Sequence, residues 1–417
     1  MAASHRARRA WPARSSPGCA RGGRTSGTRR GGPDVLAVRA GRLFDGERAL
    51  DGGAVLVQDG RILDVGAGEP PASATLVDLG PDTCLLPGLV DAHVHLAFDA
   101  SPDPVGAVEA SDDATLLARM REAAGRALQA GITTVRDLGD RSFLALELRA
   151  QLAGDGPEIL AAGPPITARG GHCHFFGGEA EGAEAIRAAV RARRDRGCDV
   201  VKVMASGGNL TPGSDPVASQ YARAELDLVV AEAREAGLPA AAHVHGAGAV
   251  ADALEAGFDT LEHVTFMSAE GVDADPALLE RIARSGVVVS ATVGAVPGHV
   301  ARGPMARRMA AVLANHGRLH RAGARIVAST DAGIGPAKPH DVLPYAIEQL
   351  AGLGMTNREA LRAATALAAE ACGVGDRKGR LQAGYDADLL AVSGDPTSTL
   401  ASIHDVAAVF RAGRRVR

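Results

Sequence analysis

Eight short runs of β-type residues alternate with segments of helical period between residues 90 and 331, and this alternation constrains the fold more than any other feature. Repeated βα units are typical of an α/β chain whose parallel strands are joined by helices. Eight such units predict a closed (β/α)8 TIM barrel rather than an open sheet. The predicted strands are VDAHVHL (90–96), TTVRDL (133–138), EILAAG (158–163), VVKVMA (200–205), PAAAHVH (239–245), TLEHV (260–264), VVVSATV (287–293) and RIVASTD (325–331).

Strand-like segments of a different kind flank this stretch at both ends. LAVRAGRLFDG and AVLVQDGRILDVG are short β-type runs broken by Gly and Asp, and GRLQAGYDADLLAVSGDP repeats the pattern near the other end. We therefore expect one small β-sandwich domain built from residues 35–88 and 379–417. The barrel is expected over residues 89–378.

Residues 1–34 are rich in Arg, Gly and Ser, poor in acids, and without the apolar stretch of a secretory signal. We expect them to be a disordered basic N-terminal extension. A transit-like peptide or a misassigned start codon would give the same composition.

The overall composition favours a small-molecule substrate. The formal net charge of -4 gives no basic field that would recruit nucleic acid or an anionic membrane. No apolar run reaches the roughly 18 residues that a membrane span requires. Five scattered cysteines without CxxC spacing indicate reduced thiols, and so a cytoplasmic protein. A homo-oligomer is left open.

Metal-ligand side chains gather at the carboxyl ends of the predicted strands, where TIM barrels place their catalytic groups. Residues i and i+2 of a strand face the same side, so both histidines of the first strand face the barrel axis. Imidazole and carboxylate suit Zn²⁺, which lowers the pKa of a bound water to about 7. The residues are His93 and His95 on the first strand, Lys202 on the fourth, His243 and His245 on the fifth, His263 on the sixth and Asp331 on the eighth.

Five segments resemble signatures of a known family. LLPGLVDAHVHL is similar to the first-strand signature of the amidohydrolase superfamily. KVMASGG, AAAHVHG, LEHVTF and ASTDAG resemble later signatures of its imidazolonepropionase-like branch, which includes metal-dependent Xaa-Pro dipeptidases. The resemblance extends from residue 35 to residue 417 and includes the closing GRLQAGYDADLLAV.

The resemblance implies a pair of divalent metal ions, expected to be zinc. His93, His95 and Asp331 would hold the more buried ion, and His243 and His263 the second. Lys202 would bridge both ions as an N6-carboxylated side chain, because a free ammonium would repel them and a buried amine with a depressed pKa reacts with CO₂. Asp331 would also act as general base and acid.

Other polar residues are expected to contact the substrate. His245, the second histidine of HVHG, would orient substrate or neighbouring groups. The segment ARGGHCHFFGGEAEG places His172, which could polarise the scissile carbonyl, and His174 in a Gly-rich loop at the active face. Tyr221 is a further candidate for substrate binding. For these loop residues the alternative is a loop that packs only on itself.

Two further pairs are interpreted as structural. Arg136 and Asp137 end the second strand, and we interpret them as an ion pair beneath the site. His316 and His320 are four residues apart on a predicted outer helix, and we interpret both as surface residues.

The predicted function is hydrolysis of an amide C–N bond by a metal-bridging hydroxide, in an Xaa-Pro-like dipeptide or an N-acyl amino acid. One alternative is a mononuclear imidazolonepropionase-like hydrolase of cyclic amides, or a deaminase. Lactone or organophosphate hydrolysis at the same centre is another. A scaffold that kept the barrel without metals is the third, and the filled ligand positions argue against it.

Overall fold

The structure is a computed structural model that describes residues 35–66, 68–272, 274–299 and 303–417. The predicted N-terminal extension, residues 1–34, therefore lies outside the described residues. Eight parallel strands in two arcs confirm the predicted barrel. The first arc contains β6 (Leu89–Val94), β7 (Ile132–Asp137) and β8 (Glu158–Ala161), and the second contains β9 (Val201–Met204), β10 (Ala240–Gly246), β11 (Thr260–Met267), β12 (Val288–Ser290) and β13 (Arg325–Val327).

Backbone hydrogen bonds just beyond the regular strands join the two arcs into a barrel. At one seam the Asp331 amide donates to the His93 carbonyl (2.8 Å), and the His95 amide donates to the Ala332 carbonyl (3.0 Å). At the other seam the Ile166 amide donates to the Lys202 carbonyl (2.8 Å). Both seams therefore run directly beside residues predicted to bind metal.

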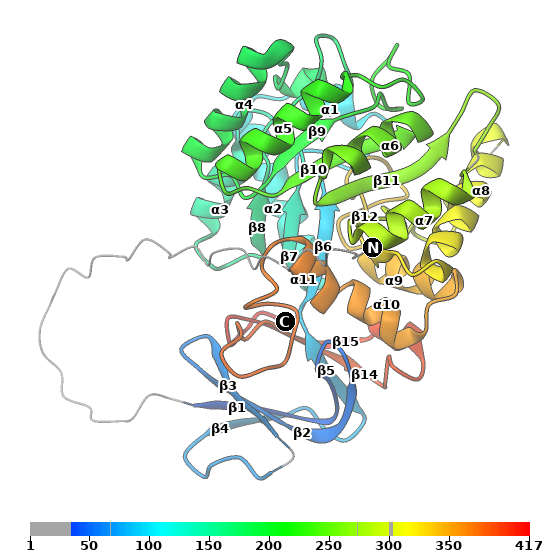
Figure 1. Cartoon of the computed structure of the whole chain (residues 1–417). Coiled ribbons are helices and arrows are strands. Elements are labelled where there is room, and N and C mark those ends of the chain that lie inside the picture. Colours follow the sequence, from blue (N-terminus) through cyan, green and yellow to red (C-terminus); the bar gives the residue numbers. More distant parts are fainter. Residues whose placement is uncertain (1–34, 67, 273, 300–302) are drawn as a thin grey trace, which may run out of the picture.

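Helices surround the barrel on its outside (Figure 1). Two of the segments of helical period between the predicted strands form α2 and α5, and the Asp112 side chain caps α2 by accepting from the Thr115 amide. The helices are α1 (Pro104–Glu109), α2 (Asp113–Gln129), α3 (Leu144–Leu152), α4 (Gly182–Arg196), α5 (Arg223–Glu235), α6 (Ala247–Ala256), α7 (Pro276–Ser285), α8 (Gly303–Arg321), α9 (Leu343–Gly352), α10 (Asn357–Ala363) and α11 (Ala366–Ala371).

The apolar faces of these helices pack on the barrel in one large core of Val, Leu, Ile and Ala with few aromatic residues. Among the described helices, none combines the length and the apolar character that crossing a lipid bilayer requires.

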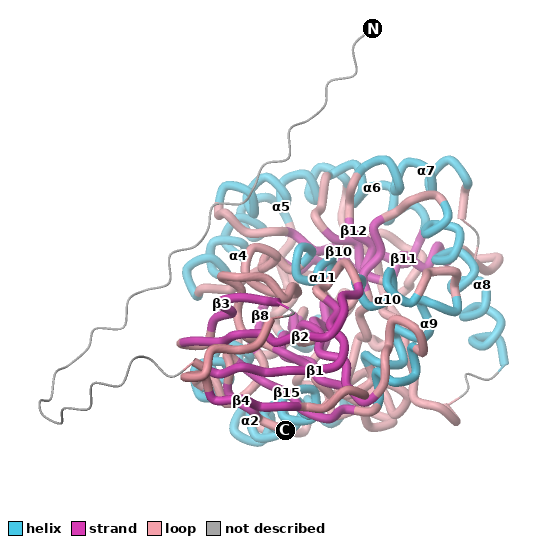
Figure 2. Tube along the Cα trace, turned by 90° about the horizontal axis from the view of Figure 1, so that it is seen from below, coloured by secondary structure: helices cyan, strands magenta, loops and turns pink. Residues whose placement is uncertain are grey.

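Strands from both ends of the chain form a separate β domain, as predicted, and it is one mixed sheet of eight strands. Its strand order is β16-β15-β14-β5-β1-β2-β3, with β4 paired to β1. Figure 2 shows this sheet from below, in front of the barrel. The strands are β1 (Leu36–Phe44), β2 (Ala49–Gln58), β3 (Arg61–Gly66), β4 (Thr75–Asp78), β5 (Thr83–Pro87), β14 (Leu389–Ser393), β15 (Val406–Arg411) and β16 (Arg414–Arg415); short 3₁₀ turns occupy His174–Phe176 and Leu400–His404.

A group of six charged side chains, which we call the basal ion cluster, ties this sheet to the barrel. Lys378 is buried, and its Nζ lies 3.0 Å from Asp386 and 3.1 Å from Glu158 at the start of β8. Three cations face three carboxylates, so the charges balance. The cluster consists of Glu158, Arg377, Lys378, Asp386, Asp388 and Arg411.

Candidate metal centre

The first candidate metal cluster lies at the seam where β6 meets the end of β13. The Nε2 atoms of His93 and His95 are 3.4 Å apart, and they lie 3.5 and 3.4 Å from Asp331 Oδ1. The centre of a triangle with sides of about 3.4 Å is about 2.0 Å from each corner, which is the usual distance between zinc and a histidine nitrogen. These three side chains therefore fit a divalent metal ion.

The second cluster consists of His243 and His245, in the second half of β10, and His263, midway along β11. The ring centroids of His243 and His263 are 4.5 Å apart, and those of His245 and His263 are 4.8 Å apart. Potential ligand atoms of the three residues lie within 4.8 Å of one another. His245, predicted to orient substrate, therefore also lies within reach of a metal ion; its role stays a prediction.

The β11 backbone departs from regular strand geometry where it carries this cluster. His263, Val264 and Phe266 have positive φ values of 70°, 49° and 54°. This left-handed conformation is costly for residues other than glycine and persists only where surrounding contacts impose it. The irregular backbone turns His263 toward the other histidines.

Each of the five histidines has one ring nitrogen held by a supporting group, which leaves the other nitrogen as the one that could bind a metal. A carbonyl or carboxylate oxygen can only accept, so the nitrogen facing it carries the proton. His93, His95, His245 and His263 are held at Nδ1, whereas His243 is held at Nε2. The partners are Glu262 for His93 (2.8 Å), the Gly139 carbonyl for His95 (3.1 Å), the Gly207 carbonyl for His243 (3.1 Å), the Thr265 hydroxyl for His245 (2.9 Å) and the Thr292 hydroxyl for His263 (2.9 Å).

The electrostatics of the site favour neutral imidazoles. Burial is the largest cause that lowers the pKa of His93, His243 and His263 well below the usual value, and the positive charge of Lys202 adds to it. Burial and Lys202 also lower the pKa of His245, to about 4. Lone pairs for metal binding are thus present at neutral pH without prior loss of a proton.

Lys202, on β9, is completely buried, and its Nζ has no hydrogen-bond partner among the described residues. Burial lowers the pKa of its amine to about 8, although the charges of Glu262 and Asp331 oppose the shift. A buried, unpartnered amine is costly unless it is neutral or modified. Carboxylation of Lys202 stays a prediction, with which the unpartnered Nζ is consistent.

His172 lies beside the second cluster. Its ring centroid is 4.7 Å from that of His243, and its Nδ1 lies 3.0 Å from the Thr211 hydroxyl. Burial is the main cause that lowers its pKa, to about 3. A Cβ atom added at Gly208 would be only 2.3 Å from the His172 Nε2 atom, so glycine leaves room for this ring.

His174 and Tyr221, the other residues predicted to contact substrate, have bonds within the loops. The Nδ1 of half-buried His174 lies 3.0 Å from the Gly171 carbonyl. Buried Tyr221 donates its hydroxyl proton to the Ala180 carbonyl (2.7 Å). Their roles in substrate binding stay predictions.

The interpretation of Arg136 and Asp137 as an ion pair is wrong. Arg136 is buried, and its Nη2 lies 3.1 Å from Glu262. The Asp137 carboxylate instead accepts hydrogen bonds from the Leu96 and Gly139 amides. Successive side chains of a strand point to opposite faces, so two adjacent residues are poorly placed to pair.

The interpretation of His316 as a surface residue is also wrong. The His316 side chain, on α8, is only 1% exposed, and its Nε2 donates to the His263 carbonyl at 2.8 Å. His320, one turn later on α8, is half-buried. The bond from His316 anchors the carbonyl of a residue that has a positive φ.

Several residues that support the ligands were missed in the sequence. Lys338 donates to the carbonyls of Thr292 (2.9 Å) and Thr330 (2.6 Å), and His340 Nε2 lies 3.1 Å from the His95 carbonyl. Both follow Asp331 in a loop without periodicity, so no local pattern indicates them. Glu262 had a usable signal, because an acid inside an apolar strand needs a buried partner.

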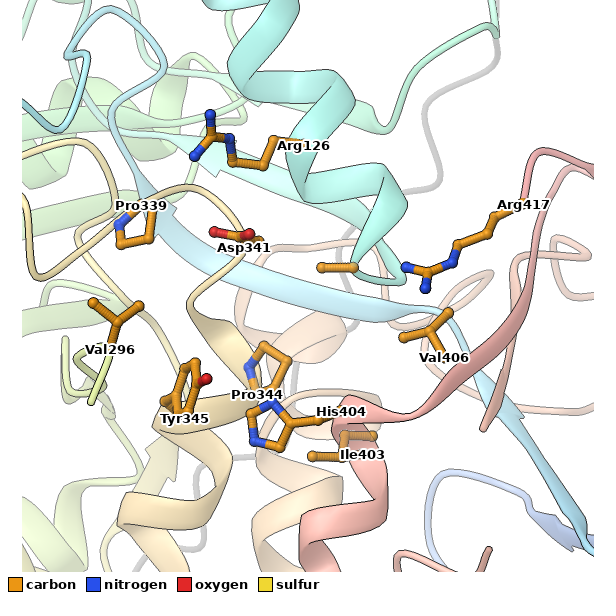
Figure 3. A pocket seen from close by; sticks show the side chains of 11 residues that line it. Arg126, Val296, Pro339, Asp341, Pro344, Tyr345, Ile403, His404, Val406 and Arg417 are labelled. Atoms are coloured by element: carbon orange, nitrogen blue, oxygen red, sulfur yellow. The ribbon is translucent and has the colours of Figure 1, made fainter. Parts of the chain in front are cut away.

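A cavity of about 320 Å³ lies away from these clusters, between the barrel and the terminal sheet (Figure 3). None of the predicted site residues lines it. Its lining consists of Arg126, Ala130, Val296, Pro339, Asp341, Pro344, Tyr345, Ile403, His404, Val406 and Arg417.

Comparison with known proteins agrees with this geometry. Ochratoxinase of Aspergillus niger is 28% identical over 90% of this chain and 84% of its own length. Imidazolonepropionase of Acidiphilium cryptum is 29% identical over 82% of this chain and 86% of its own length. The crystal structure of a Xaa-Pro dipeptidase with methionine bound in its active site has a TM-score of 0.80 at 26% identity, covering 92% of this chain and 100% of that chain. A model described as the amidohydrolase family matches residues 84–416, so this chain belongs to the amidohydrolase family.

Proposed function

We propose that this metal-dependent amidohydrolase uses a pair of metal ions, expected to be zinc, to hydrolyse the amide bond of a dipeptide or an N-acyl amino acid. The observation that carries the proposal is Lys202, a fully buried amine on β9, the strand paired with β10, whose Nζ has no hydrogen-bond partner among the described residues. A single metal ion would need only one cluster. A carboxylated Lys202 would add an anionic ligand that helps to hold both ions.

The bound metal pair would supply a water that ionises near neutral pH and would polarise the substrate carbonyl. Asp331 faces both clusters, because its Oδ1 lies 3.4 Å from His95 and its Oδ2 lies 4.0 Å from His263. In the proposed reaction this carboxylate would accept the proton of the attacking water and return it to the leaving nitrogen.

His172 is assigned the polarisation of the substrate carbonyl from the opposite side. The Cys173 amide already donates to the Thr211 hydroxyl oxygen, so the hydroxyl proton can point at His172 Nδ1. The proton of the neutral ring then sits on Nε2, which could donate to a carbonyl oxygen.

The similarity to ochratoxinase and to a Xaa-Pro dipeptidase holding methionine supports an amide substrate. The similarity to imidazolonepropionase favours a second candidate, the hydrolysis of a cyclic amide at a single metal ion. The second cluster and Lys202 favour amide hydrolysis by two metal ions, since a single ion would need neither of them.

Metal analysis combined with a substrate screen tests the proposal. Protein produced with added zinc, stripped with a chelator and reloaded with zinc, manganese or cobalt should regain two ions per chain by mass spectrometry of the elements. The reloaded protein is then assayed with Xaa-Pro and other dipeptides, N-acyl amino acids and imidazolone propionate. One ion or fewer per chain, or turnover of imidazolone propionate alone, would contradict the binuclear amide hydrolase.

A further inference from the structure

A row of buried polar groups crosses the barrel interior from β7 through β11 to β6 and ends at a predicted metal ligand. Arg136, Glu262 and His93 are each at most 1% exposed. We propose that Glu262 is a positioning residue that makes the first cluster, His93, His95 and Asp331, the tighter of the two metal sites. The inference rests on the metal pair proposed above.

Both carboxylate oxygens of Glu262 are engaged in hydrogen bonds. Its Oε2 lies 2.8 Å from His93 Nδ1. Its Oε1 accepts from Arg136 Nη2 at 3.1 Å and from the Thr260 hydroxyl at 2.6 Å. Arg136 is fixed in turn, because its Nε donates to the Ala92 carbonyl at 2.7 Å. The carboxylate therefore has one orientation, and it points one oxygen at the His93 ring.

This contact controls which nitrogen of His93 is available. An ionised carboxylate only accepts hydrogen bonds, so the His93 proton must sit on Nδ1. The lone pair then lies on Nε2, the atom that is 3.5 Å from Asp331 Oδ1 and 3.4 Å from His95 Nε2. The negative charge behind the ring also makes Nε2 a better electron donor to a cation.

The five histidines differ in the charge of the groups that hold them. Within the described residues, Glu262 is the only carboxylate at hydrogen-bond distance from any of the five engaged nitrogens, since Asp331 Oδ2 lies 4.0 Å from His263 Nδ1. His243, His245 and His263 are held by a backbone carbonyl and two threonine hydroxyls, all of them neutral. The first cluster also contains the Asp331 carboxylate. Both differences favour tighter binding of a divalent cation at the first cluster.

The ion pair with Arg136 suggests a competing role for Glu262, namely that it only neutralises the buried charge of Arg136. A structural pair would stabilise the barrel but would leave the metal affinity of the folded protein unchanged. Measuring the affinity of each metal site separately distinguishes the two roles.

The test is a zinc titration of chelator-stripped protein against a competing chromophoric chelator, which gives a dissociation constant for each of the two ions. Wild type should fill in two steps. Glu262→Gln should raise the dissociation constant of the tighter site by about 10–100-fold, which is the usual effect of removing the partner of a metal-bound histidine. The weaker step should change much less. When cobalt replaces zinc, the absorption spectrum of the first equivalent bound by Glu262→Gln should also differ from that of wild type.

Two further variants serve as controls. One tests whether misfolding explains the result, and the other tests whether the loss of any histidine partner has the same effect. Arg136→Met combined with Glu262→Met removes both charges of the buried pair, which proteins tolerate better than the loss of one. It should weaken the same step. Thr292→Val removes a neutral partner of His263 instead. It should affect only the weaker step.

The outcomes separate this inference from the proposed function. If folded Glu262→Gln and the double variant both keep the wild-type constant for the tighter step, Glu262 is merely structural and the inference is wrong. If wild type itself takes up fewer than two zinc ions, the proposed metal pair fails, and this inference fails with it.

Discussion

Lys202 illustrates how burial changes the chemistry of a single side chain. In water its amine would be protonated at neutral pH, whereas burial lowers its pKa to about 8 in the barrel. A fraction of neutral amine is then present at pH 7 to 8, and only the neutral amine can add to CO₂. The same burial lowers the pKa of the neighbouring His243 and His263, so one physical cause favours the neutral form of both kinds of predicted ligand.

The proposed bridging role of Lys202 predicts a large loss of activity when its amine is removed. Lys202→Ala should lower kcat/KM by at least about 100-fold, equivalent to about 3 kcal/mol or more of transition-state stabilisation. Acetate or propionate added at high concentration should restore part of the activity, because either can place a carboxylate in the space left. His93→Ala serves as the control, since these anions cannot replace a histidine. Full activity of Lys202→Ala without added acid would refute the bridging role.

His172 can be displaced without being mutated. In Gly208→Ala the new methyl group would meet the His172 ring at 2.3 Å, and the ring has little freedom because Thr211 holds its Nδ1. We expect kcat to fall by about 10-fold or more, with metal content unchanged, if His172 polarises the substrate. Gly248→Ala is the matched control, because nothing lies within 4 Å of its added carbon. Equal activity of the two variants would argue against the role of His172.

The sequence indicated the predicted ligands because their chemistry depends on local spacing and on the strand ends. The partners of those ligands could not be predicted in the same way. Glu262 is 169 residues from His93, and the Gly139 carbonyl is 44 residues from His95, so their contacts exist only in the closed barrel. The assignments of catalytic, metal-binding and substrate-binding roles stay predictions.

At the level of elements, α8 and β11 depend on each other. The positive φ values of β11 place His263 in the second cluster, and His316 of α8 donates to the His263 carbonyl. Spacing alone suggested that His316 and His320 were equivalent outer residues. The inward direction of His316 could not be deduced, because it is set by an irregular stretch of a strand more than 50 residues earlier.

His316→Leu should disturb the second cluster from a distance. The buried His263 carbonyl would lose its donor, which costs about 1–3 kcal/mol in the free energy of unfolding. The dissociation constant of the weaker zinc site should rise, because the His263 backbone would no longer be held in place. Urea unfolding and the zinc titration measure the two effects. His320→Leu, on the same helix but half-buried, should change neither quantity appreciably. If the two leucine variants behave alike, α8 does not position His263.

At the level of the whole molecule, the two-part architecture was predicted because hydrophobic periodicity changes sharply along the chain. The structure confirms a barrel and a terminal sheet built from both ends. The way in which they are joined was not predicted. The basal ion cluster combines Glu158 of the barrel with Asp386, Asp388 and Arg411, more than 200 residues later, and charged residues near strand ends are too common in sequence to reveal such pairing.

The basal ion cluster should make stability depend on pH. Burial alone raises the pKa of Glu158, but the hydrogen bond from Arg377 and the charge of Lys378 outweigh it and lower the pKa to about 2. A carboxyl whose pKa is depressed by folding stabilises the folded state above its unfolded pKa of about 4.5, and the effect is lost as the pH falls from there through 2. The expected loss is on the order of 3 kcal/mol.

Urea unfolding of metal-free protein between pH 6 and pH 2 measures this loss. Glu158→Gln should be less stable than wild type at pH 6 and should show a shallower decline on acidification. Glu184→Gln is the control, because the Glu184 side chain is 90% exposed. Parallel pH curves for wild type and Glu158→Gln would mean that the cluster does not act through this carboxyl.

The seam between β6 and the end of β13 also has a consequence for synthesis and folding. His93 and Asp331 are joined there by a backbone hydrogen bond, although one lies near the start of the barrel and the other near its end. A growing chain on the ribosome cannot assemble the first cluster until the last barrel strand has emerged. Contacts of such long range form late and slowly. A cation bound by this cluster would therefore stabilise the closed barrel. Its uptake could occur only after the barrel has closed.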